Sequence, residues 1–248
     1  MTHPGEVPLA TRLRQASTAK LLELIDQHAA QLTVREVRQV LRNPFASAEV
    51  VEVLAAMPQL LTAYEVRAAI ARYPRTPKML ALRFVPGLYW RELMELGQDV
   101  RVTPAVRRAA EKYLVQRLRG LAVGEKMTLA RRASPAVLVE LGKDPHVPVI
   151  AALLDNPRLT EEVLLPILRH ATLRPQALDL IASHPRWGVR YDVRRALCQH
   201  PLTPFRVIFA LLPSLHPHDL QTVIDASDLS AIVVERAREL LEAASAKS

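Results

Sequence analysis

The sequence has little of several residue types on which common protein classes depend. It holds one cysteine, Cys198, which excludes an intramolecular disulfide and a metal site built from several cysteines. Seven glycines and 4% aromatic residues are too few for the turns and strands of an all-β protein. No apolar run approaches the roughly 20 residues of a membrane span, and the first residues lack the plan of a signal peptide. We therefore expect a cytoplasmic protein that makes no contact with membranes.

What the chain does contain favours helices and a large core. Half of its 248 residues are apolar, and Leu, Ala, Val and Arg are its characteristic residues. The formal net charge is +8, and most of the basic residues are arginines. A basic balance permits contact with nucleic acid, anionic lipid or an acidic protein without selecting among them.

Two local patterns predict where helices begin. Thr33–Glu36 and Thr62–Glu65 fit the capping box, in which a hydroxyl and a carboxylate satisfy backbone amides at a helix start. In the second pattern a Ser or Thr hydroxyl caps the helix and the following Pro occupies its first position. This pattern occurs at Thr76-Pro77, Thr103-Pro104, Ser134-Pro135 and Thr203-Pro204. We expect Gly97 and Gly142 to end helices in the left-handed conformation.

Two phrases recur along the chain. The stretch 193–204 matches 66–77 and, more loosely, 149–160, with a Val eight residues before the turn Pro. Counted by Val66, Val106, Val149 and Val193, the spacing is 40 to 44 residues, and a second phrase at 93–99 returns 45 residues later at 138–144. A period of 40–45 residues predicts a helix pair as the repeat unit.

This phrase, carried best by the turns 74–77 and 201–204, resembles bacterial HEAT-like repeat proteins and is also similar to the leucine-rich-repeat-variant family. The unit of the second family is much shorter, and its founding member is linked to an iron–sulfur cluster that needs several cysteines, so we prefer the HEAT-like interpretation. The resemblance implies an all-α, right-handed α-solenoid of about five HEAT/armadillo-like helix pairs plus caps, whose usual work is to hold partners. We expect a lead and capping helices at 1–32, the repeats at 33–241, and a tail at 242–248.

Candidate catalytic and metal-binding groups are sparse. Phosphate-binding loops and the common hydrolase and metalloprotease motifs are missing. His184, His200, His216 and His218 could hold a metal, but His184 and His200 precede prolines at expected helix ends, where they suit the last carbonyls better. Cys198 could be an activated thiol beside Arg194 and Arg195, although burial in a packing helix is the simpler interpretation. We therefore predict no enzyme activity, no cofactor, no metal and no small-molecule substrate.

The charge distribution is the most useful functional signal. Residues 101–132 carry nine basic side chains against two acidic ones, whereas residues 1–60 are balanced. The simplest alternative is that these arginines bridge neighbouring repeats. We predict a non-catalytic scaffold that binds a macromolecular partner, most readily a protein, with nucleic acid as the alternative. The residues predicted to contact it are Arg101, Arg107, Arg108, Arg117, Arg119, Arg131 and Arg132.

Overall fold

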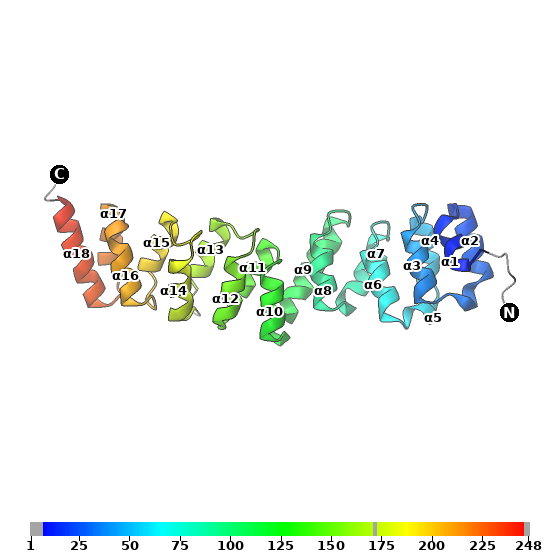
Figure 1. Ribbon diagram of the computed structural model, residues 1–248, viewed down its shortest axis with the longest axis horizontal. Helices are drawn as coiled ribbons and strands as arrows, with labels where there is room; N and C mark the ends of the chain where they lie inside the picture. Colours follow the sequence, from blue (N-terminus) through cyan, green and yellow to red (C-terminus); the bar gives the residue numbers. More distant parts are fainter. Residues whose placement is uncertain (1–6, 171–172, 246–248) are drawn as a thin grey trace. The chain divides into compact units, whose positions relative to one another are not determined.

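A computed structural model describes residues 7–170 and 173–245 of the chain. These residues form 18 α-helices and four short 3₁₀ helices, and no strand occurs among them (Figure 1). The all-α expectation is therefore confirmed. The chain divides into two compact units, residues 1–117 and 118–248.

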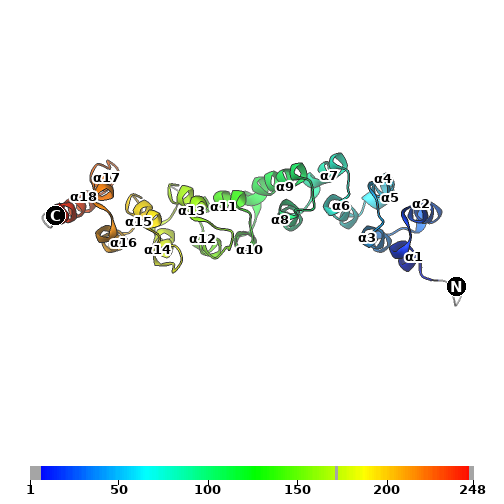
Figure 2. The same ribbon diagram turned by 90° about the horizontal axis from the view of Figure 1, so that it is seen from above.

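In unit 1 the helices form two layers (Figure 2). The first layer packs α1 against α3 and α3 against α6, and an ion pair joins α6 to α8; the second packs α2 against α4 and α7 against α9. The first-layer helices are α1 (Leu9–Gln15), α3 (Val34–Arg42), α6 (Tyr64–Arg72) and α8 (Trp90–Gln98). The second layer holds α2 (Thr18–Gln27), α4 (Ala48–Ala55), α7 (Lys78–Phe84) and α9 (Pro104–Arg117), with the connecting helices η1 (Ala29–Gln31), α5 (Pro58–Leu61) and η2 (Val85–Gly87).

Unit 2 is built in the same way. One layer packs α11 (Pro135–Leu141) against α13 (Glu161–Leu168) and α13 against α15 (Tyr191–Cys198), and it also includes α17 (Pro217–Ile224). The other layer consists of α10 (Val123–Ala130), α12 (Val147–Leu154), α14 (Pro175–Ser183), α16 (Phe205–Leu211) and α18 (Ala231–Ser245), with η3 (Leu118–Gly120) and η4 (Leu212–Ser214) as connections. Because α18 runs to Ser245, residues 242–245 of the expected tail are helical. The rest of that tail, 246–248, and the first part of the expected lead, 1–6, lie outside the described residues.

Of the two predicted capping boxes, one is confirmed and the other is wrong. Thr33 forms the predicted capping box with Glu36 at the start of α3. The second capping box is wrong: α6 begins at Tyr64, with Ala63 as its N-cap, and the Thr62 hydroxyl donates instead to the carbonyl of Gln59. The short helix α5 explains this outcome, because its last turn already engages Thr62.

The Ser/Thr-Pro pattern marks helix starts, but its hydroxyls do not cap them. Pro104 and Pro135 open α9 and α11 as predicted, whereas Pro77 and Pro204 lie one residue before α7 and α16. The hydroxyl of Thr76 donates to the carbonyl of Ile70, which belongs to the preceding helix, at 2.6 Å. Those of Ser134 and Thr203 are buried and make no hydrogen bond. These hydroxyls lie inside the helix-to-helix turns, so the tertiary packing of each turn decides their contacts.

The two glycines also have a different role from the predicted one. Gly97 lies inside α8, and Gly142 has φ −62°, so neither adopts the left-handed conformation. A Cβ on Gly142 would lie 2.5 Å from Cγ1 of Ile167, and one on Gly97 would lie 3.0 Å from Cγ of Glu111. These glycines therefore permit the close approach of α11 to α13 and of α8 to α9.

The spacing of 40–45 residues does not correspond to one helix pair, contrary to our expectation from the sequence. Val66 lies in α6 and Val106 in α9, so that this spacing takes in three helices rather than two. The four valines of the phrase are all buried and share a packing role, which explains why they recur. Successive first-layer helices of unit 1 begin at Leu9, Val34, Tyr64 and Trp90, so the helix pair is clearly shorter than a HEAT-like unit of about 40 residues.

Residues 9–117 and 135–245 are two copies of one arrangement. Over most of their length, equivalent positions differ by 127 in residue number, and the spacings between the starts of α11, α13, α15 and α17 match those in unit 1 to within one residue. The helices correspond in order from α1 and α11 to α9 and α18, and η2 corresponds to η4. Identical residues at equivalent positions include Thr33 and Thr160, Tyr64 and Tyr191, Val106 and Val233, and Ala110 and Ala237. We call these segments the first and the second copy.

Buried asparagines form hydrogen bonds between the turns that follow neighbouring helices of one layer. The side-chain amide of Asn43, which follows α3, donates to the carbonyls of Leu13 and Ala16 at 2.8 Å each. That of Asn156, which follows α12, donates to the carbonyls of Ala130 and Ala133 at 2.6 and 3.2 Å. In each case the amide oxygen accepts a bond from the backbone N–H two residues later. The turns at the ends of the helices are thereby held in fixed positions.

Candidate functional site

The candidate site is a groove in the first copy that crosses α3, α6 and the turns that follow α3, α6 and α8. Its cavity measures about 680 Å³. We call it the arginine groove, because its charged lining consists of one aspartate, Asp99, and five arginines, Arg38, Arg42, Arg72, Arg75 and Arg101. Leu41, Pro44, Ala69 and Pro74 provide its apolar surface, and Asn43 and Tyr73 complete the lining.

Three of the five arginines are held by neighbouring groups. Arg75 donates to the carbonyls of Pro44 and Ala46 at 2.7 and 3.0 Å and so joins the turns after α3 and α6. Arg72 forms an ion pair with Glu95 of α8. Arg101 makes a bidentate contact with Asp99 at 2.9 and 2.7 Å, which lowers the pKa of Asp99. The pair between Arg72 and Glu95 is largely exposed to solvent, so it adds little to stability, whereas in the second pair Arg101 is 71% and Asp99 20% exposed.

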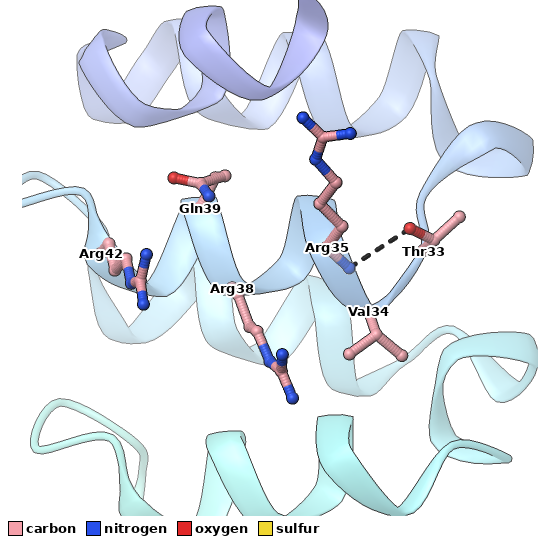
Figure 3. Close-up of a pocket in the computed structure, with 6 residues that line it drawn as sticks. All are labelled: Thr33, Val34, Arg35, Arg38, Gln39 and Arg42. Atoms are coloured by element: carbon pink, nitrogen blue, oxygen red, sulfur yellow. Dashed lines mark hydrogen bonds between the residues drawn. The ribbon is translucent and has the colours of Figure 1, made fainter.

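The other two arginines have free guanidinium groups. Arg38 and Arg42 are exposed, and within the described part of the chain their side chains make no hydrogen bond or ion pair. A second hollow of about 480 Å³ adjoins them on α3 and adds Arg35, which is also exposed (Figure 3). Figure 3 shows Arg35 and Arg38 extending to opposite sides of α3. Their spacing of three and four residues places the backbone positions of all three arginines along one face of this helix, and from that face the side chains of Arg35 and Arg38 run in opposite directions.

The second copy contains the equivalent groove, with a different charge. A cavity of about 610 Å³ crosses α13, α15 and α17, and eight of its lining residues occupy positions equivalent to those of arginine-groove residues. Arg169 stands where the first copy has Arg42, whereas Leu165, Gln199 and Asp228 replace Arg38, Arg72 and Arg101. With two arginines and three aspartates, this groove has lost the positive charge of the first.

The second groove is also more tightly bonded within itself. Asp219 is buried there, accepts a hydrogen bond from the hydroxyl of Tyr191 and lies 3.6 Å from Arg195. Arg195 in turn contacts Asp192 at 2.8 Å. Most of its charged groups are therefore satisfied internally, unlike Arg38 and Arg42 in the first copy.

The seven arginines predicted from the sequence are divided between the units. Arg101, Arg107, Arg108 and Arg117 belong to unit 1, and Arg119, Arg131 and Arg132 to unit 2. Of the seven, Arg101 lines the arginine groove. Arg107 and Arg117 lie near opposite ends of α9, about 15 Å apart at 1.5 Å per residue.

Individual environments separate these seven residues further. Arg117 donates to the carbonyls of Pro86 and Leu88, as expected of an arginine that bridges neighbouring helices. Arg107 is half-buried, and its Nε has no partner. The remaining predicted residues, Arg108, Arg119, Arg131 and Arg132, are exposed.

The groups considered for chemistry are engaged in the fold. Cys198 is fully buried, and burial raises the pKa of its thiol to about 12, which disfavours the thiolate. His200 is buried, which lowers its pKa, and its Nδ1 accepts the backbone N–H of Leu202 at 3.1 Å. Nδ1 of His184 accepts the N–H of Arg186 at 3.2 Å. Among residues 7–170 and 173–245, no three His, Cys, Asp or Glu side chains are grouped to hold a metal ion.

Sequence reasoning missed most of the arginine groove because it summed charge along the chain. Residues 1–60 are balanced overall, yet Arg35, Arg38 and Arg42 share one face of a helix. Plotting charge by helix face would have found this stripe.

In the described residues, every helix is too short or too polar to cross a membrane. Comparison with protein-family models, curated proteins and solved structures finds no match to this chain.

Proposed function

We propose that the chain is a non-catalytic, α-solenoid scaffold that binds an anionic macromolecular partner, most readily a protein, through the arginine groove. The observation that carries the proposal is the presence of two free guanidinium groups, Arg38 and Arg42, in a cavity whose lining has five arginines and one acid. Unpaired like charges held close together repel one another, and an anionic partner removes that cost.

The solenoid assignment is supported by the two-layered packing of successive helix pairs in each unit. The helix pair is shorter than the HEAT-like period that we expected. We set aside the leucine-rich-repeat-variant resemblance for two reasons, and one of them was that the unit of that family is shorter than the period we expected. The short helix pair removes this reason. The other reason, the single cysteine, remains.

The alternative is nucleic-acid binding through residues 101–132. It is supported by the exposure of Arg108, Arg119 and Arg131. Against it, Arg117 is directed to backbone carbonyls, and Arg101 is paired with Asp99.

A salt gradient on immobilised heparin, a generic polyanion, separates the two proposals. If the groove binds the anion, Arg38→Gln with Arg42→Gln should elute at clearly lower salt than the parent protein, because each lost anion contact reduces the salt dependence of binding. Arg83→Gln with Arg91→Gln is the matched control: it removes the same charge from exposed positions of unit 1 outside the groove. An elution shift confined to Arg107→Gln with Arg108→Gln would instead favour the alternative. Equal elution of the groove variant and the control would contradict the groove proposal.

A further inference from the structure

We infer that the occupant of the arginine groove is an acidic, extended segment of another protein, with carboxylate side chains at every third residue and apolar side chains between them. The inference rests on the proposed function, since it assigns a partner to the same groove. Four observations support it: the chemistry of the donors, their spacing, the apolar surface between them, and the altered groove of the second copy.

The donors of the groove suit carboxylates. A guanidinium presents two parallel N–H groups that match the two oxygens of a carboxylate. Arg38 and Arg42 have these groups free. Arg72 already holds the carboxylate of Glu95 in an exposed pair, and a partner's carboxylate could share Arg72 without burying an uncompensated charge.

The spacing of the donors fits an extended chain. Arg38 lies on α3 and Arg72 on α6, two helices that pack against each other. Packed helices lie about 8–10 Å apart. A polyproline II segment advances about 3.1 Å per residue with three residues per turn, so that every third side chain returns to the same face after about 9 Å. A segment of this form can therefore place successive carboxylates opposite successive helices.

Apolar surface separates the arginines. Leu41 lies between Arg38 and Arg42 on α3, Ala69 lies three residues before Arg72 on α6, and Pro44 and Pro74 lie in the two turns. Phe45, beside Pro44, is 57% exposed. A protein segment can cover this surface with apolar side chains, whereas the bases of a single-stranded nucleic acid stack best on aromatic faces. Tyr73 is the aromatic residue of the lining, and its hydroxyl is bound to the carbonyl of Ala46 at 2.8 Å.

The second copy shows which of the two equivalent grooves suits an acidic segment. Its groove keeps Arg169 but carries Asp192, Asp219 and Asp228. These aspartates would repel the carboxylates of the segment, so the arginine groove of the first copy is the better site for it.

Fluorescence anisotropy with labelled probes tests the inference. The probe is a peptide of about 12 residues made of repeated Glu-Pro-Val triplets, which favour the polyproline II form. The same peptide with Gln for Glu, and single-stranded and duplex DNA of similar length, serve for comparison. We expect the Glu peptide to bind at least about tenfold more tightly than the Gln peptide and than either DNA.

Three variants locate the binding. Arg38→Gln with Arg42→Gln should weaken binding of the Glu peptide by at least about tenfold, and Arg38→Lys with Arg42→Lys should weaken it less, because charge is kept while the bidentate geometry is lost. Arg169→Gln, at the position equivalent to Arg42 in the second copy, should leave it unchanged. Far-UV circular dichroism checks that each variant is folded. If DNA binds more tightly than the Glu peptide and its binding depends on Arg38 and Arg42, the inference fails while the proposed groove stands. If no probe responds to the groove variants, both fail.

Discussion

The hydroxyl of Tyr64 accepts a hydrogen bond from the backbone N–H of Tyr89 at 2.8 Å, and the two rings lie 4.3 Å apart. Tyr191, which holds the position of Tyr64 in the second copy, repeats this contact with the N–H of His216 at 2.9 Å and a ring separation of 4.5 Å. The first contact joins the start of α6 to the start of α8, and the second joins the start of α15 to the start of α17. Equivalent hydrogen bonds therefore link equivalent pairs of helices in the two copies.

The two tyrosines should differ in their contribution to stability. Tyr64→Phe removes a hydrogen bond to an exposed residue and an interaction with the carboxylate of Glu92, which is less buried than its equivalent Asp219, and should lower the free energy of unfolding by about 0.5–1.5 kcal/mol. Tyr191→Phe also deprives the buried carboxylate of Asp219 of its hydroxyl donor and should cost about 1.5–3 kcal/mol. Urea denaturation of the two variants beside the parent measures both values. Equal losses would mean that the bond to the buried Asp219 contributes no more than the interaction of Tyr64 with Glu92.

Gly142 should not tolerate a methyl group. The side chain of Ile167 is buried and stands within 2.5 Å of the added Cβ, so Gly142→Ala should destabilise the protein by about 1–3 kcal/mol. Gly124 in α10 has no neighbour within 4 Å of such a Cβ, and Gly124→Ala should be neutral or stabilising by up to about 1 kcal/mol. Thermal unfolding followed by circular dichroism compares the pair. If Gly142→Ala were as stable as the parent protein, the space between Gly142 and Ile167 would have to accommodate a methyl group, which contradicts the close approach of α11 to α13.

The ion pair between Lys126 and Asp144 should make stability depend on acid pH. The two side chains are 11% and 8% exposed, and the charged atoms are 2.8 Å apart. Burial opposes ionisation of Asp144, but hydrogen bonds from Lys126 and His146 outweigh it and lower its pKa. Its stabilisation is therefore fully present above the unfolded pKa of about 3.9 and is lost as the pH falls below that value through the folded pKa.

Replacing this carboxylate tests the assignment. Asp144→Asn should cost about 3–5 kcal/mol at pH 7, because it leaves the buried ammonium of Lys126 without a charge partner. The variant should also lose less stability than the parent on acidification. Glu140→Gln, which removes the carboxylate of the more exposed pair with Lys143, should cost less than about 1 kcal/mol. Urea titrations between pH 7 and pH 3 provide the data, and an unchanged acid dependence in Asp144→Asn would refute the role of this residue.

Cys198 should resist thiol reagents in the folded protein. Its side chain is buried, and its pKa is raised to about 12, so almost none of it is thiolate at pH 8. We expect an aromatic disulfide reagent to modify the protein only after addition of denaturant. Rapid modification of the native protein would reopen the possibility of a functional thiol.

The accuracy of the sequence predictions followed the range of the interactions involved. The capping box at Thr33 needs only residues within one turn, and it was found. The role of Gly142 depends on Ile167, which lies on another helix, so no local pattern could show it. The recurring valines suggested the wrong length for the helix pair. Each buried helix face needs a small apolar side chain, so a valine recurs whichever place its helix holds in the repeat. The arginine groove was missed because its members come from separate helices and turns, and their charges align only after folding.

The order of the helices has a consequence for how the chain is made. Each principal helix contact joins elements within three places of each other in the chain. Closing short loops costs little chain entropy, and proteins with such local contacts fold fast for their size. A chain still emerging from the ribosome can therefore bury its first helices before the last are synthesised. We expect ribosome-bound chains that have exposed residues 1–117 to resist limited proteolysis already, a protection that would be absent if the first copy could fold only after the second was complete.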